Sequence, residues 1–138
     1  MILVADSGST KTDWRIVASD GTEKRISTVG INPFHQRGDD IINILNNSEL
    51  PEFADQVTKV FFYGAGCNYD DKIKIVHDSI VKVFNNAYVE VYHDLIAAAR
   101  ALCGRSEGIT CILGTGSNSC YYDGINVARN RPSLGYVL

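Results

Sequence analysis

The sequence lacks several features that define special classes of protein. Its four cysteines, Cys67, Cys103, Cys111 and Cys120, form no C-x-x-C pair among 138 residues. An even number of cysteines does not by itself indicate a disulfide framework in a chain of this size. We therefore expect reduced thiols that are buried as small hydrophobic side chains.

A strong net charge is missing as well. Thirteen Lys and Arg residues against sixteen Asp and Glu residues give a formal net charge of -3. Such a small and dispersed charge does not indicate a basic surface that binds nucleic acid or anionic lipid. We expect neither nucleic acid nor a membrane as a partner.

The beginning of the chain lacks a targeting segment. Met1 is followed directly by Ile-Leu-Val-Ala-Asp, without a cationic leader, a long apolar stretch or a small-residue cleavage site. This indicates a cytoplasmic protein. Hydrophobic residues make up 45% and charged residues 21% of the chain, which excludes disorder, collagen and coiled coil and is typical of a globular domain.

Hydrophobic periodicity and turn residues predict an α/β fold. Apolar, β-branched runs predict strands, spacing at three and four residues predicts helices, and Asp20-Gly21 and Asp123-Gly124 are hairpin signals. The expected strands cover residues 2–5, 14–18, 24–29, 57–63, 88–92, 109–113 and 119–122; the expected helices begin near residues 39, 70 and 95. The order is βββαβαβα followed by a hairpin that repeats the opening one, as in a duplicated domain whose second copy is cut short.

The first group of chemically relevant residues, positions 6–12, lies in the turn of the opening hairpin. Glycine lets the backbone approach a phosphate, hydroxyl and N–H groups bind its oxygens, and a carboxylate at a strand end can hold hydrated Mg²⁺. The spacing is not that of a Walker loop, because the lysine does not follow the required glycine pattern. A solvated turn with Lys11 in water is the alternative interpretation.

The second group, residues 114–118, holds the same place in the second hairpin. Gly-Thr-Gly-Ser is also an ordinary turn sequence. Two such turns after two similar strands are more informative, because a nucleoside triphosphate held between paired domains needs two phosphate-binding hairpins.

Asp94 is the third candidate, at the end of a strand and the start of a helix. An N-cap role would explain an aspartate there. As a general base it would accept the proton of an attacking hydroxyl during phosphoryl transfer. The neighbouring His93 is interpreted as a surface or structural histidine.

Taken in order, five segments of the chain resemble the N-acetylglucosamine kinase family of the BadF/BadG ATPase group, within the actin, sugar kinase and heat-shock ATPase superfamily. They cover residues 6–14, 30–32, 64–67, 93–100 and 112–118. The resemblance implies a ribonuclease-H-like (actin-like ATPase) domain over residues 1–106, with a mixed five-stranded sheet and helices on both faces. Residues 107–138 would start a second, truncated domain of the same kind.

The resemblance also implies roles for individual residues. ATP and Mg²⁺ would be the cofactors, and a small sugar would be the substrate. Asp94 would be the catalytic base for the sugar 6-hydroxyl, and Asp6 would lie near Mg²⁺. The cofactor-binding residues would be Asp6, Gly8, Ser9, Thr10, Lys11 and Thr12 in the first loop and Gly114, Thr115, Gly116 and Ser117 in the second. The sugar-binding residues would be Asn32, Gly66, Asp94 and Asn118, together with Ser133 and Leu134, which stand where the family has a Gly-Trp pair.

Several questions stay open at the level of the sequence. The chain resembles the amino-terminal part of a kinase, most closely one that makes N-acetylglucosamine 6-phosphate, and the isolated chain is expected to be inactive. An ATPase activator of a 2-hydroxyacyl-CoA dehydratase and a non-catalytic sugar sensor are the alternatives on the same fold. The identity of the amino sugar and the existence of a homodimer are open.

Overall fold

The computed structural model describes residues 1–114 and 117–131. They belong to two compact units, the first covering Met1–His93 and the second starting at Asp94. Each unit is described by itself.

The first unit is built on a mixed five-stranded sheet with the order β3-β2-β1-β4-β5. The first three strands form the predicted antiparallel meander, whereas β4 and β5 run parallel to β1. This order confirms the predicted ribonuclease-H-like topology. The strands are β1 (Ile2–Ser7), β2 (Lys11–Val17), β3 (Glu23–Val29), β4 (Lys59–Gly64) and β5 (Tyr88–His93).

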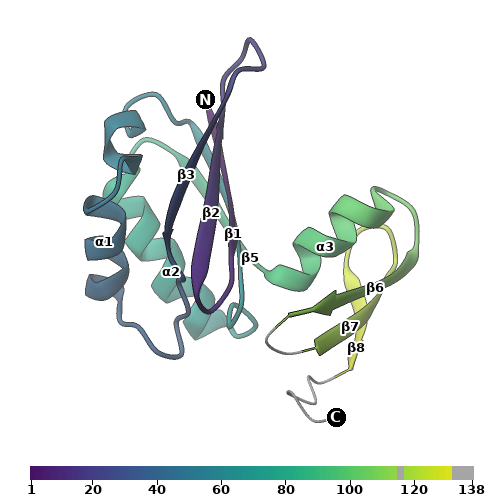
Figure 1. Ribbon diagram of the computed structural model, residues 1–138. Coiled ribbons are helices and arrows are strands. Elements are labelled where there is room, and N and C mark those ends of the chain that lie inside the picture. Colours follow the sequence, from purple (N-terminus) through teal and green to yellow (C-terminus); the bar gives the residue numbers. More distant parts are fainter. Residues whose placement is uncertain (115–116, 132–138) are drawn as a thin grey trace. The chain divides into compact units, whose positions relative to one another are not determined.

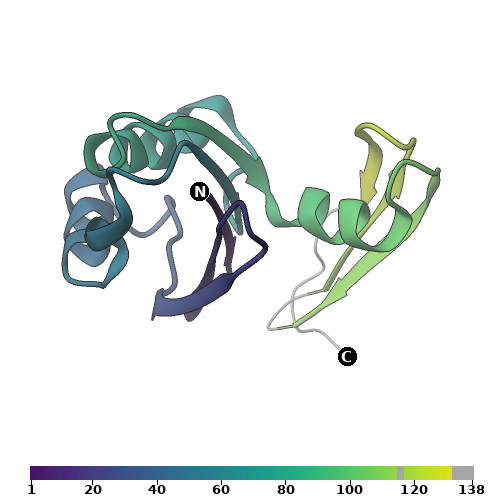
Figure 2. The same ribbon diagram turned by 90° about the horizontal axis from the view of Figure 1, so that it is seen from above.

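Two helices, α1 (Gly38–Asn46) and α2 (Asp70–Val83), lie side by side on one face of this sheet (Figure 1). The view from above shows the same face covered (Figure 2). Acidic first turns favour both helix starts, as the sequence predicts. A short 3₁₀ helix, η1 (Leu50–Phe53), follows α1, and Pro51 lies in its first turn, where the missing N–H is tolerated.

The core lies between the sheet and these helices. Alternate residues of β1 and β2 are buried, because successive strand side chains point to opposite faces. Trp14 and Phe62 are fully buried, with ring centroids 5.8 Å apart. The indole N–H of Trp14 donates to Thr28 Oγ1 at 3.0 Å, so the largest core side chain leaves no polar group unsatisfied.

The opening hairpin is longer than the sequence suggests. We expected its turn to begin at Asp6 and its second strand to begin at Trp14, but β1 continues to Ser7 and β2 begins at Lys11. Only residues 8–10 connect the strands. The strands were underestimated because their buried positions there are the polar residues Ser7 and Thr12, which carry no hydrophobic signal.

The second unit contains α3 (Asp94–Cys103) and an antiparallel sheet of β6 (Gly108–Leu113), β7 (Ser117–Tyr122) and β8 (Val127–Arg131). The predicted hairpin thus continues into a third strand. Helix α3 packs on this sheet, so the compact units divide before Asp94. The domain boundary after residue 106 stays a prediction.

The four cysteines are all thiols. Cys67 and Cys120 are buried, as expected, but Cys103 is half-buried and Cys111 is exposed. The expectation of burial is wrong for Cys111, because it occupies the outward-facing side of β6. None of the helices within residues 1–114 and 117–131 has the length and apolar character needed to cross a membrane.

The burial of Phe62 yields a stability prediction. Phe62→Ala should lower the free energy of unfolding by about 3–5 kcal/mol, because it removes a fully buried ring and leaves a cavity beside Trp14. Urea denaturation followed by tryptophan fluorescence measures this change. Tyr88→Ala, at a side chain that is 62% exposed, should change it by about 1 kcal/mol or less; equal losses would contradict the assignment of the core.

Candidate functional site

The turn of the opening hairpin presents backbone donors to solvent. Gly8, Ser9 and Thr10 are exposed. The N–H of Gly8 donates to the carbonyl oxygen of Lys11 at 2.9 Å and closes the turn. Within the described chain the N–H groups of Ser9 and Thr10 have no acceptor. Two successive N–H groups without an acceptor, beside a lysine, are donors suited to an anion.

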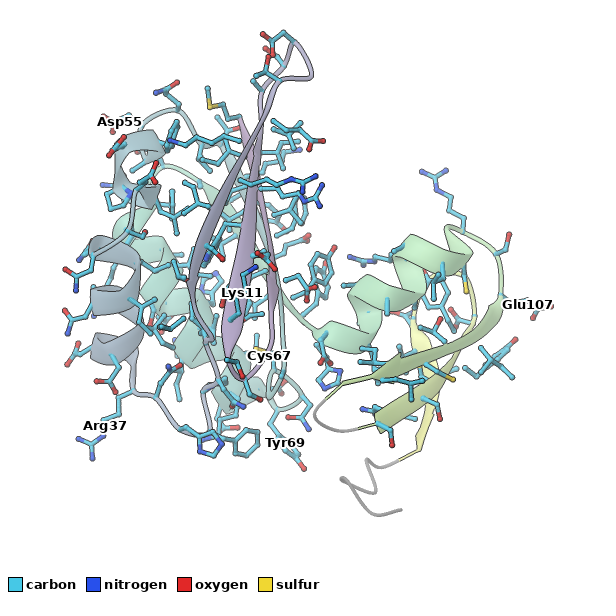
Figure 3. All side chains as sticks on the ribbon, in the orientation of Figure 1. Lys11, Arg37, Asp55, Cys67, Tyr69 and Glu107 are labelled. Carbon is cyan, nitrogen blue, oxygen red and sulfur yellow. The ribbon has the colours of Figure 1, made fainter. Side chains whose placement is uncertain are left out.

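Charged side chains cover the sheet face opposite the helices, next to this turn. Asp6 on β1 lies opposite Asp13 on β2 in the strand register, and Lys11 Nζ lies 2.6 Å from Asp13 Oδ1. A hollow of about 350 Å³ on this face is lined in part by Asp6, Lys11, Asp13, Arg15 and Arg25. Figure 3 labels Lys11 on β2. The predicted residues Asp6 and Lys11 therefore share one surface.

The ion pair changes the titration of Asp13. Its pKa lies below the ordinary value of 3.8, chiefly because Lys11 donates a hydrogen bond to the carboxylate. Ser27 Oγ also donates to Asp13 at 3.3 Å. Because both members of the pair are more than half exposed, solvent screens their attraction. Asp13 is not among the predicted site residues, because a charged side chain in the alternating pattern of a strand is usually solvated.

Thr12 faces the interior, in contrast to the other residues of the predicted phosphate loop. Its side chain is fully buried, with Oγ1 2.6 Å from Ser7 Oγ and 3.2 Å from the carbonyl oxygen of Val29. The hydroxyl therefore supports the base of the hairpin. Of the predicted loop, the structure brings Ser9, Thr10 and Lys11 together on the outside and places Thr12 beneath them.

Gly30 allows the hairpin turn to pack on the segment after β3. A Cβ atom at this position would lie 2.4 Å from the carbonyl oxygen of Gly8 and 2.6 Å from Ser9 backbone atoms. The Gly30 N–H donates to the carbonyl oxygen of Thr10 at 2.9 Å. Only glycine permits this approach of two backbones, which accounts for the glycine at the start of the segment at residues 30–32.

The structure brings together two predicted sugar-binding residues, Asn32 and Gly66. A Cβ atom on Gly66, whose φ is +81°, would lie 2.5 Å from Asn32 Oδ1. That oxygen accepts the N–H of Phe34 at 3.0 Å, which leaves the amide NH₂ group of Asn32 as its donor group. Phe34 and Tyr69 form an exposed edge-to-face pair with ring centroids 6.2 Å apart.

All these segments meet at the carboxyl ends of the parallel strands. Ser7 on β1 is in register with Gly64 on β4, and Gly64 with His93 on β5. Ligands of open α/β sheets bind at such strand ends. Figure 3 labels Cys67 and Tyr69 where β4 leads into α2.

Asp94 follows His93 directly and is the first residue of α3. The sequence predicts Asp94 as the N-cap of a helix that starts at residue 95, so the helix begins one residue earlier than predicted. The carboxylate is half-buried, and its Oδ1 accepts the N–H of Leu95 at 2.9 Å. This contact orients the side chain at the helix start.

The second predicted loop is described in part. Gly114 is exposed after β6, and Ser117 opens β7. Asn118 Oδ1 accepts the N–H of Ser119 at 2.9 Å. Thr115, Gly116, Ser133 and Leu134 lie outside the described residues.

The donor set of the first unit fits a metal-bound polyphosphate. Unpaired N–H groups and an ammonium suit phosphate oxygens, and the exposed carboxylate of Asp6 is a ligand type that Mg²⁺ prefers, directly or through water. Asp6 would hold the hydrated metal, and the hairpin would hold the phosphates.

Two solved structures share the fold at low identity. The ethanolamine utilization protein EutJ from Carboxydothermus hydrogenoformans matches with a TM-score of 0.60 at 12% identity, over 96% of this chain and 51% of its own. The MamK double helical filament matches with a TM-score of 0.63 at 11% identity, over 99% of this chain and 55% of its own. The chain thus has the actin-like ATPase fold.

A third solved structure is much more similar. It is the putative N-acetylglucosamine kinase of Porphyromonas gingivalis, with 47% identity and a TM-score of 0.91 over 100% of this chain and 50% of that protein. The chain belongs with this protein in one family, as the resemblance of the sequence to the N-acetylglucosamine kinase family predicts, and membership of the wider BadF/BadG group stays a prediction. It spans about half the length of the structures it matches. No protein-family model and no curated protein matches it.

The close approach at Gly30 can be tested by adding one methyl group. Gly30→Ala should lower the free energy of unfolding by about 1–3 kcal/mol, because the Cβ atom would overlap the Gly8 and Ser9 backbone. It should also shift the amide resonances of residues 8–10. Gly8→Ala, whose Cβ atom would meet only the Lys11 oxygen at 3.8 Å, is the matched control and should unfold like the wild type. Equal effects of the two changes would argue against this packing.

The Lys11–Asp13 pair can be tested by carboxyl titration. Lys11→Met should raise the pKa of Asp13 toward its ordinary value, because the main hydrogen bond to the carboxylate is lost. A carboxylate with a lowered pKa stabilises the fold above its unfolded pKa and loses that contribution as the pH falls, so the variant should lose less stability on acidification. Carbon-detected NMR measures the titration.

Lys74→Met provides the matched control for this titration. Lys74 Nζ lies 2.7 Å from Asp78 Oδ2 and lowers the pKa of Asp78 in the same way. This variant should raise the pKa of Asp78 and leave Asp13 unchanged. An unaltered Asp13 titration in Lys11→Met would show that the pair does not form in solution.

Proposed function

We propose that the protein to which this chain belongs transfers the γ-phosphate of ATP to an amino sugar. The proposed reaction converts N-acetylglucosamine to N-acetylglucosamine 6-phosphate. The observation that carries the proposal is the 47% identity over the whole chain to the kinase-named protein of P. gingivalis. The convergence of the hairpin turn and the Asn32 segment at one end of the sheet supports it.

The hairpin turn is the proposed phosphate site. Ser9 and Thr10 donate backbone N–H groups and hydroxyls to phosphate oxygens, and the ammonium of Lys11 neutralises their charge. Asp6 holds the hydrated Mg²⁺, which supplies charge neutralisation on the phosphates when bound. Gly114, Thr115, Gly116 and Ser117 form the second phosphate loop, and Thr12 contributes by supporting the first one.

The sugar is proposed to bind next to Asn32 and Gly66. The amide N–H groups of Asn32 suit the oxygens of sugar hydroxyls, and Gly66, where a Cβ atom would overlap Asn32 Oδ1, lets the turn after β4 pack closely against this side chain. Phe34, which is half exposed, borders this position with its ring. Asn118, Ser133 and Leu134 complete the sugar-binding set on the basis of the family resemblance.

Asp94 is the proposed base. Its carboxylate accepts the proton of the sugar 6-hydroxyl as the oxygen attacks the γ-phosphorus. The bond from that phosphorus to the β–γ bridging oxygen breaks, and ADP leaves. Phosphoryl transfer depends on positioning more than on strong basicity, so the half-buried carboxylate held by the Leu95 N–H is suited to the task.

The remaining properties follow from this reaction. A kinase that consumes ATP is expected in the cytoplasm, and the protein is expected to act on a small molecule. Membership of the wider BadF/BadG group and a homodimer are further expectations.

The base can be tested in the full-length protein with ATP and N-acetylglucosamine. Asp94→Asn should reduce kcat by about 10²- to 10⁴-fold, because the amide cannot accept the proton, while the affinity for ATP stays near that of the wild type. Formation of sugar 6-phosphate and ADP measures the rate, and titration calorimetry measures ATP binding.

Asp70→Asn is the matched control, because Asp70 is also the first residue of a helix. It should leave kcat unchanged. Normal turnover in Asp94→Asn would refute the assignment of the base, and a full-length wild-type protein without sugar phosphorylation would refute the proposed function.

A further inference from the structure

Ser7 lies at the point where the hairpin turn meets the Asn32 segment. It is the last residue of β1, and its side chain is fully buried on the helix-covered face of the sheet. The Ser7 hydroxyl makes three contacts. Oγ lies 2.6 Å from Thr12 Oγ1, accepts the Ile31 N–H at 3.0 Å and donates to the Ile31 carbonyl oxygen at 3.1 Å.

These contacts join the end of β1 to the start of β2, five residues on, and to the segment after β3, 24 residues on. Thr12 is the second residue of β2, directly after Lys11, and Ile31 immediately precedes Asn32. The carbonyl oxygen of Ser7 accepts the N–H of Ala65 at 2.9 Å, next to Gly66. Ser7 therefore links the proposed phosphate turn to both proposed sugar-binding segments.

The arrangement uses the full capacity of a hydroxyl, which has one donor and two acceptor sites. The two hydroxyl protons of Ser7 and Thr12 are distributed over three contacts. These are the contact between the two hydroxyls, the one with the Ile31 carbonyl oxygen and the one with the Val29 carbonyl oxygen. Because Ile31 is fully buried, its N–H has no access to water if Ser7 moves away. A displacement of the hairpin turn is thus transmitted to the Asn32 backbone.

We propose that Ser7 is a positioning residue that makes nucleotide and sugar binding cooperative. This inference rests on the proposed function, because it assigns the two ends of the network to the two substrates. Occupation of the phosphate turn fixes the Ser7–Thr12 pair, and this pair holds residues 31 and 32 in the arrangement that binds the sugar. The first ligand to bind bears the entropy cost of ordering these residues, so the second ligand binds more tightly.

Titration calorimetry on the full-length protein measures the coupling. The Kd of N-acetylglucosamine is determined alone and with a saturating, non-hydrolysable ATP analogue and Mg²⁺. In the wild type the analogue should tighten sugar binding by about fivefold or more. In Ser7→Ala this factor should fall below about twofold, because the Ile31 N–H loses its acceptor.

Ser79→Ala is the matched control. Ser79 is also buried, and its Oγ donates to the carbonyl oxygens of Ile75 at 2.7 Å and Gly38 at 3.2 Å, so it too joins two segments. This variant should lose stability but keep the wild-type coupling factor. Thr12→Val retains the Ser7–Ile31 contacts while removing the partner hydroxyl, and it should show an intermediate factor; it decides the question if Ser7→Ala does not fold.

The outcomes separate the inference from the proposed function. If the wild type binds neither ligand, the proposed function is wrong and the inference falls with it. If both ligands bind but the wild type shows no coupling, the inference alone is overturned. The same holds if Ser7→Ala or Thr12→Val lowers the unfolding temperature and keeps the full coupling factor, because a purely structural hydroxyl would behave in that way.

Discussion

The backbone contact between Gly30 and the hairpin turn is the constraint on which the rest of the candidate site depends. The carbonyl oxygen of Gly8 would lie 2.4 Å from any Cβ atom at position 30, and the Gly30 N–H bonds to Thr10. Two loops whose main chains approach this closely cannot move separately. The turn that carries the phosphate donors and the segment that carries Asn32 are therefore one structural body within the first unit.

The sheet topology places the hairpin turn and the Asn32 segment at the edge where ligands of α/β sheets bind. Parallel strands β1, β4 and β5 end at the same edge, and the turn after β4 brings Gly66 against Asn32. The opposite face of β1 and β2 carries charged side chains instead of a helix in the first unit, with Lys11 paired to Asp13 beside Asp6. One end of the sheet thus combines amide donors, a cation and carboxylates, which are the groups that a metal-bound phosphate requires.

Much of this could be predicted from the sequence. Apolar periodicity and turn signals located the five strands and both α-helices of the first unit, but not the short helix η1 or the start of β2 at Lys11. The extent of the hairpin and the role of Ser7 could not be predicted, because buried hydroxyls have no hydrophobic signature and their partners come from Ile31 and Ala65, far along the chain. The need for glycine at position 30 is likewise a tertiary effect.

The alternation of strand side chains explains why the motif at residues 6–12 is polar throughout. A turn that only binds phosphate needs polar groups on its outer side, and Ser9, Thr10 and Lys11 provide them. The inner positions, Ser7 and Thr12, would be apolar in an ordinary hairpin on a core. Their hydroxyls are retained at zero exposure because the buried backbone groups of Val29 and Ile31 require partners there. The motif thus has an outer set of ligand donors and an inner set of structural donors, and the inner set links the turn to the neighbouring segment.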